Sequence, residues 1–131
     1  MYTDIESDIF SVFGDAAWSA ESVSTYPSNF IPENPGSEFL RVTILSAARD
    51  MRSASGQLII DIFTPAGEGQ SRAIAIADIL DRFFRNKSLK TGLGTTQFFL
   101  SSIVPAGPDM DNPSLYRSNY SISFNYFGVQ Q

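Results

Sequence analysis

The carboxyl-terminal part of the chain contains a strictly alternating segment, and this pattern constrains the fold more than any other feature. From Tyr120 to Tyr126, large apolar or aromatic residues occupy every second position, and Ser or Asn occupies each position between them. Successive side chains of a β-strand point to opposite faces of a sheet, so the segment predicts a strand with one aromatic face and one hydroxyl and amide face. Such a sheet needs a second layer to cover its aromatic face.

Other segments predict further strands of the same sheet. Phe39–Leu45 alternates apolar and polar residues, and Gln57–Thr64 is apolar on both faces, as is typical of a strand inside a sheet. Thr95–Val104 predicts a third strand, and Ser22–Tyr26 a short edge strand. Ser46–Gly56 has no sustained period, so we expect an exposed hairpin loop there.

Two segments have the spacing of amphipathic helices. The first runs from about residue 4 to residue 17, and Thr3 stands three residues before a glutamate, as in a capping box. The strongest helical pattern covers Ile76–Phe84, and Gly92 and Gly94 supply its stop. The order of elements predicts an α+β domain with a mostly antiparallel sheet of about four to five strands and two helices packed on one face.

Composition limits both size and chemistry. The 131 residues are 43% apolar and suffice for one domain, residues 1–131, with its own core. The chain has neither Cys nor His, which excludes disulfides, thiolate and imidazole catalysis and nearly every structural zinc site. The net charge of −5 disfavours tight binding to nucleic acid, because such binding depends on Lys and Arg contacts to phosphates. We therefore expect no enzyme, no cofactor and no catalytic or metal-binding residue.

The chain also lacks the pattern of a membrane protein. No stretch approaches the roughly 20 apolar residues of a membrane span. Acidic residues at Asp4, Glu6 and Asp8 stand where a signal peptide would carry positive charge. We expect a protein without membrane partners that is made in the cytoplasm.

Asp61 is the carboxylate with the greatest claim to a chemical role, because it interrupts an otherwise apolar strand. A buried carboxylate is a candidate for acid-base chemistry, and a carboxylate-only hydrolase is the one credible enzyme for this composition. The alternative is that Asp61 lies on a solvated strip of the sheet, or pairs with Arg41 or Arg117. A Gly67–Gly69 turn resembles a phosphate-binding loop only weakly, because no Lys-Ser/Thr pair follows it.

Two polar loops are the candidate partner-binding segments. Arg49, Asp50 and Arg52 lie in the loop at 46–56, where the arginines are suited to an anionic partner or a neighbouring subunit. Asp109 and Asp111 lie in the loop at 105–115, with the oxygen ligands of a turn or an adventitious cation site. We expect these loops at opposite or adjacent rims of the sheet.

Five segments together resemble the tail terminator family of long-tailed bacteriophages, in order and spacing over nearly the whole chain. They are Ile31–Pro35, Phe39–Ile44, Ile60–Gly69, Ala77–Phe84 and Tyr120–Tyr126. The resemblance implies a structural protein of the virion tail and neck that forms a homo-oligomeric, hexameric ring. Such a ring caps the head-proximal end of the tail tube, stops its polymerisation and offers a joining surface to the head connector.

The resemblance also implies the partners: the tail tube protein, the head connector or neck protein, and DNA that passes through the lumen without specific binding. An acidic lumen wall would repel phosphates over a Debye length of about 8 Å. Two other readings stay open at this point. One is a neck or head-completion protein of a phage, and the other is a small dimeric ligand-binding α+β domain.

Overall fold

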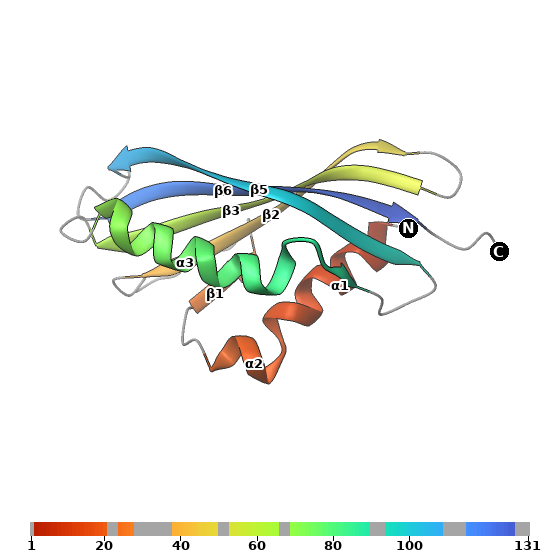
Figure 1. Cartoon of the computed structure of the whole chain (residues 1–131), viewed down its shortest axis with the longest axis horizontal. Helices are drawn as coiled ribbons and strands as arrows, with labels where there is room; N and C mark the ends of the chain where they lie inside the picture. The colour runs from red at the N-terminus through yellow and green to blue at the C-terminus, as the bar shows by residue number, and fades with distance from the viewer. Residues whose placement is uncertain are drawn as a thin grey trace.

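The computed structural model describes residues 2–20, 24–27, 38–49, 53–65, 69–89, 94–108 and 115–127. These residues form three helices and six strands, which lie in two layers with the helices beneath one face of a curled sheet (Figure 1). The elements in chain order are α1 (Tyr2–Phe13), α2 (Ala16–Ser19), β1 (Ser24–Pro27), β2 (Phe39–Arg49), β3 (Ser53–Pro65), α3 (Gly69–Phe84), β4 (Ser88–Leu89), β5 (Thr95–Pro108) and β6 (Leu115–Phe127).

The sheet has the order β1-β2-β3-β6-β5-β4, and all its pairs are antiparallel except β1 with β2. The predicted α+β class and mostly antiparallel sheet are confirmed. The predicted strand count of four to five is wrong, because β4 adds a sixth strand. Ser88–Leu89 is too short to show an alternating period, so only its pairing with β5 reveals it.

The predicted loop at 46–56 is also wrong in its extent. β2 continues to Arg49 and β3 begins at Ser53, with Arg49 paired to Ala54. A register shift between Ser46 and Ala48 marks a bulge. A bulge inserts a residue and breaks the side-chain period, while the backbone ladder continues on both sides of it. The sequence pattern therefore ended before the strand did.

The first predicted helix is divided in two, so the described chain has three helices instead of two. α1 begins at Tyr2, which places Thr3 inside the helix instead of at its N-cap. Asp15 ends the run: its side chain accepts a hydrogen bond from the Ala17 N–H at 2.9 Å and caps α2. The helical spacing of apolar residues continues past residue 13, but the cap at Asp15 begins a second helix.

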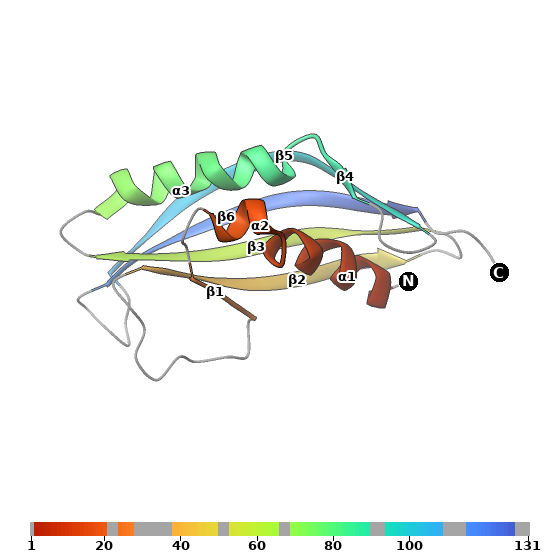
Figure 2. The same ribbon diagram turned by 90° about the horizontal axis from the view of Figure 1, so that it is seen from below.

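The core fills the space between the helices and one face of the sheet (Figure 2). The alternating residues of β6 are buried there, as predicted. α1 is fixed to the sheet by a buried hydrogen bond of 2.6 Å from the Thr96 hydroxyl to the Asp8 carboxylate. The largest fully buried side chains are Tyr120, Tyr126, Phe84, Phe98, Phe124, Ile5, Ile9, Leu40, Leu58, Ile60, Ile62 and Ile76.

A second, smaller cluster lies on the other face of the sheet. Phe39, Phe63 and Leu115 are buried together, with Tyr26 packed against them. The rings of Phe39 and Phe63 stack with centroids 4.4 Å apart. This cluster confirms that β3 is covered on both faces over part of its length. Within the described ranges, no helix combines the length and hydrophobicity that crossing a bilayer requires.

Candidate functional site

The sheet face opposite the helices, which we call the open face, displays a group of large apolar side chains. Register places Leu45, Val104 and Phe127 on it, because their strand neighbours alternate with the buried residues of the helix side. They are exposed to 48, 57 and 52%, respectively. Exposed apolar side chains on one face of a sheet are candidate positions for a contact surface.

A β-bulge in β5 adds two more residues to this group. Phe98 pairs with Phe124 and Ser101 pairs with Ile122, so Phe99 and Leu100 together face the single residue between those partners. Phe98 and Ser101 belong to the helix side, so both intervening side chains project from the open face. Leu100 is 66% exposed, the largest value among the described large hydrophobic residues.

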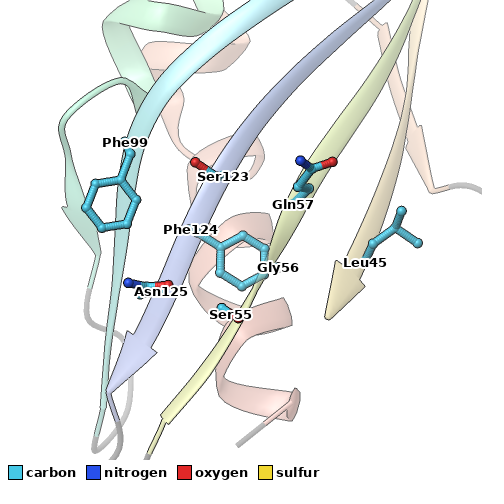
Figure 3. Close-up of a pocket in the computed structure, with 8 residues that line it drawn as sticks. All are labelled: Leu45, Ser55, Gly56, Gln57, Phe99, Ser123, Phe124 and Asn125. Atoms are coloured by element: carbon cyan, nitrogen blue, oxygen red, sulfur yellow. The ribbon is translucent and has the colours of Figure 1, made fainter. Parts of the chain in front are cut away.

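A shallow groove of about 360 Å³ crosses the open face between β2 and β5 (Figure 3). Leu45 and Phe99 stand at its two sides, and Gln57, Ser123 and Asn125 supply amide and hydroxyl groups between them. None of its lining residues carries a charge. The groove therefore offers contact area and hydrogen bonds, and no acid-base pair for catalysis.

Asp61 lies further along the open face in an ionic cluster. Its Oδ2 atom is 3.4 Å from a terminal nitrogen of Arg41 and 3.2 Å from one of Arg117. The Arg41 guanidinium also lies 5.2 Å from the ring centroid of Phe63, within cation-π range. The predicted pairing of Asp61 is thus confirmed with both arginines. A carboxylate that is shared by two guanidiniums serves mainly as their structural counter-ion. This arrangement weakens the hypothesis that Asp61 is a catalytic acid.

Among the residues that the structure describes, both edges of the sheet have an unpaired segment. β1 covers the outer side of β2 only at Phe39–Val42. β4 and the residues before it cover the outer side of β5 only as far as Phe99. In the part of the chain that the structure describes, no strand lies beside Thr43–Arg49 of β2 or Leu100–Pro108 of β5 on their outer sides. Unpaired strand edges are templates for pairing with another chain.

A small notch of about 230 Å³ lies beside the unpaired edge of β5, between that strand and α3. Asp81 Oδ1 accepts hydrogen bonds there from the Ser101 hydroxyl at 2.5 Å and the Tyr120 hydroxyl at 2.7 Å. Burial, together with the neighbouring Asp81 carboxylate, raises the pKa of Tyr120 well above its ordinary value of 10.0. Asp78 and Arg85 line the same notch. We call it the acidic notch, since its two carboxylates outnumber its one guanidinium.

The structure locates the predicted partner-binding residues only in part. Arg49 is the last residue of β2. Asp50, Arg52, Asp109 and Asp111 lie outside the described residues. The strand ends that flank the two segments lie at opposite ends of the sheet, since Ser53 pairs with Phe127 while Pro65 pairs with Leu115. Among the described residues no group of three or more Asp or Glu side chains is placed to hold a metal ion.

Sequence reasoning did not find the acidic notch or the unpaired edges. Asp81 occupies an ordinary exposed-side position of a helical pattern, and its partners are 20 and 39 residues away along the chain. A pairing over such distances leaves no local signal. The proline at position 105 is one clue to an edge strand, because proline cannot donate to a ladder.

Comparisons with known proteins show that solved structures share the fold of this chain. No family model matches the chain, and no curated protein matches it. A solved protein that carries no functional name superimposes with a TM-score of 0.72 at 19% identity, over 96% of this chain and 98% of its own. A chain of the virion of a native gene transfer agent particle superimposes with a TM-score of 0.67 at 14% identity, over 97% of both chains. At these identities the two matches establish a shared fold.

Proposed function

We propose that this chain is a virion structural protein of a phage-like particle, acting as a tail terminator. In this role its copies form a hexameric ring that caps the head-proximal end of a tail tube, stops polymerisation and offers a joining surface to the head connector. The protein would act in the tail and neck of the virion after assembly in the host cytoplasm. The proposal includes that the protein is not an enzyme.

The observation that carries the proposal is the match to the gene transfer agent virion, which covers 97% of each chain. The sequence resemblance to tail terminators points to the same class of particle. The structural match shows a shared fold. The proposed position of this protein within the particle therefore depends on the sequence resemblance to tail terminators.

The shape of the sheet supports assembly into a ring. A ring of identical subunits needs two different surfaces that fit each other and close under rotation. The unpaired outer sides of β2 and β5 are two such surfaces at opposite sides of one sheet. Exposed apolar residues on both of these strands, Leu45 on β2 and Leu100 and Val104 on β5, would be covered by such contacts.

The charge distribution suits a lumen through which DNA passes without specific binding. The open face carries three charged side chains within the described residues, Arg41, Asp61 and Arg117, and they neutralise one another in part. The expected acidic wall is therefore not a property of this face. Two guanidiniums against one carboxylate, on a face that otherwise carries hydroxyl, amide and apolar groups, still give phosphates little counter-charge to bind.

Electron microscopy of the purified protein mixed with isolated tail tubes tests the proposal. A terminator places a ring on one end of the tubes in the absence of heads and stops further addition of tube subunits. Tubes that stay uncapped at saturating protein would overturn the proposed role.

A neck or head-completion protein is the second candidate, because membership of a virion particle fits both roles equally. Such a protein would bind purified portal complexes and leave isolated tubes uncapped. A protein that light scattering finds as a dimer at every concentration, with or without tubes, would instead favour a small ligand-binding domain.

A further inference from the structure

The ionic cluster on the open face carries one surplus positive charge. Arg41 and Arg117 both reach the same carboxylate oxygen of Asp61, at 3.4 and 3.2 Å. The two guanidiniums contribute two positive charges, and Asp61 contributes a single negative charge. Among the described residues, neither arginine has an ion pair with any other acid. The cluster therefore attracts one further negative charge.

Most hydrogen-bond donors of the two arginines are not used by the protein. A guanidinium has five N–H donors. In the part of the chain that the structure describes, the contact with Asp61 is the one polar side-chain contact of Arg41 and of Arg117. Both distances exceed the roughly 2.7–2.9 Å of a strong charge-assisted hydrogen bond. Arg117 Nε is buried and has no partner, which costs free energy until an acceptor is supplied.

Aromatic rings hold the two guanidiniums in place without using their N–H groups. The Cζ atoms of Arg41 and Arg117 lie 5.2 and 6.0 Å from the ring centroid of Phe63, within cation-π range. The Phe63 ring is itself fixed by its stacking on Phe39. The arginine side chains are exposed to 29 and 38%, so a ligand can reach them from the open face. The positive charges are thus both oriented and accessible.

The charge and the donors together select the ligand. We propose that Arg41 and Arg117 form a binding site for a carboxylate, which bridges the two guanidiniums beside Asp61. Parallel N–H groups of a guanidinium match the two oxygens of a carboxylate. One carboxylate neutralises the cluster, whereas a phosphate monoester, with about 1.5 to 2 negative charges at pH 7, would leave an excess of negative charge beside Asp61.

A nucleic acid strand fits this site less well than a carboxylate does. Binding to nucleic acid gains its affinity from many cations along the phosphate backbone. Within the described residues, the open face has two basic side chains, and both belong to this cluster. A single bound carboxylate needs no more than these two.

The carboxylate can come from a free molecule or from a side chain of another copy of the chain. The first 40 residues contain seven of the 14 acidic residues and no basic residue. Two of these acids, Glu6 and Asp15, are exposed on the helix layer, on the other side of the sheet from the cluster. They cannot reach the cluster of their own copy, but they are available to a neighbouring one.

Acetate is the probe that tests the site. The side-chain N–H resonance of Arg117 Nε, which is protected by burial, should shift to saturation in NMR spectra when acetate is added at constant ionic strength. The variant R117K identifies this resonance by removing it. Inorganic phosphate at the same concentration should shift it less. No saturable shift with acetate, or an equal response to phosphate, would overturn the inference.

Three variants test the assigned roles. R41Q should weaken acetate binding by about tenfold, because one of the two guanidiniums is lost. D61N should strengthen binding by about fivefold or more, because the charge of the cluster rises from one to two. R82Q replaces an exposed arginine of α3 and should leave the affinity unchanged. An affinity that R41Q does not alter, or that D61N lowers, would contradict the inference.

Thermal unfolding keeps the test decisive where D61N is less stable than the wild type. Acetate should raise the unfolding temperature of D61N more than that of the wild type, because a ligand of the folded state stabilises it in proportion to its affinity. An equal effect of acetate and chloride on D61N would count against the site.

Light scattering distinguishes the two sources of the carboxylate. If a neighbouring copy supplies it, acetate and R41Q should each reduce self-association relative to the wild type in chloride. If a free molecule supplies it, acetate should bind and leave self-association unchanged. These measurements need no tail tubes, so a failure of acetate to bind leaves the proposed function standing, and uncapped tubes leave the carboxylate site standing.

Discussion

The Tyr120 hydroxyl donates a hydrogen bond to Asp81 Oδ1 at 2.7 Å, and the same oxygen accepts a second bond from Ser101. One carboxylate of α3 is thus joined to both β5 and β6. This junction holds the helix layer against the half of the sheet that carries the unpaired β5 edge. It therefore also fixes the wall of the acidic notch.

Tyr120 makes the stability of the protein sensitive to alkaline pH. Its pKa is raised in the folded state by burial and by Asp81, while the unfolded chain has a tyrosine pKa near 10. The folded state thus retains the phenolic proton after the unfolded state has lost it. Its contribution to stability is fully present below pH 10 and falls above it, by up to about 1.4 kcal/mol per pH unit.

Urea unfolding at pH 8, 10 and 11 measures this effect against the variant Y120F. The wild type should lose more free energy of unfolding between pH 8 and pH 11 than Y120F does, because only the wild type has a phenol with a raised pKa at position 120. Parallel pH profiles for the two proteins would show that Tyr120 titrates normally.

Asp61 should contribute to stability through its two arginines. Replacing it with Asn removes the only negative charge of the cluster and leaves two guanidiniums side by side over a buried ring. We expect D61N to lower the free energy of unfolding by about 1–3 kcal/mol, less than for a fully buried pair because both arginines are partly exposed.

R41Q should cost less than D61N, about 1 kcal/mol or less, because Asp61 keeps Arg117. E6Q, at an exposed position of α1, serves as the control and should change stability by no more than about 0.5 kcal/mol. Equal stabilities of D61N and E6Q in denaturant titration would refute a stabilising role of the cluster.

Gly94 is required for close packing at the start of β5. A Cβ atom at this position would overlap the Tyr126 ring and lie 2.7 Å from the Phe127 carbonyl oxygen, which is backbone and cannot move aside easily. G94A should therefore lower the free energy of unfolding by about 2–4 kcal/mol. At Gly14 the same change meets only an ordinary contact of 3.4 Å, so G14A should be neutral within about 1 kcal/mol. Thermal unfolding of the two variants provides the comparison.

Leu100 and Val104 should matter for assembly and not for folding. Both are more than half exposed on the unpaired part of β5, so L100S/V104S should change monomer stability by no more than about 1 kcal/mol. The same variant should reduce the ring population in native mass spectrometry, because it removes apolar area from the proposed interface. F127S changes an equally exposed residue at the end of β6 and should leave the ring population unaltered. Equal ring populations in both variants would argue against the β5 edge as a subunit contact.

The sequence by itself determined the elements that depend on near neighbours. The alternation of Tyr120–Tyr126 and the helical spacing of Ile76–Phe84 each indicate which face is buried. This information is enough to recognise a strand or a helix. The ionic partners of Asp61 were also within reach, because few bases were available in the neighbouring predicted strands. The break at Asp15 was missed because a single cap outweighs the continuing period.

Only the tertiary structure decided what lies at the edges of the sheet. The strand β4, the continuation of β2 to Arg49 and the junction of Asp81 with Tyr120 all depend on backbone or side-chain bonds between distant parts of the chain. Hydrogen bonds of this kind depend on position and not on a residue pattern, so they leave no period to read. The placement of the unpaired segments of β2 and β5 at opposite sides of the sheet, on which the proposed ring depends, is a property of the whole sheet.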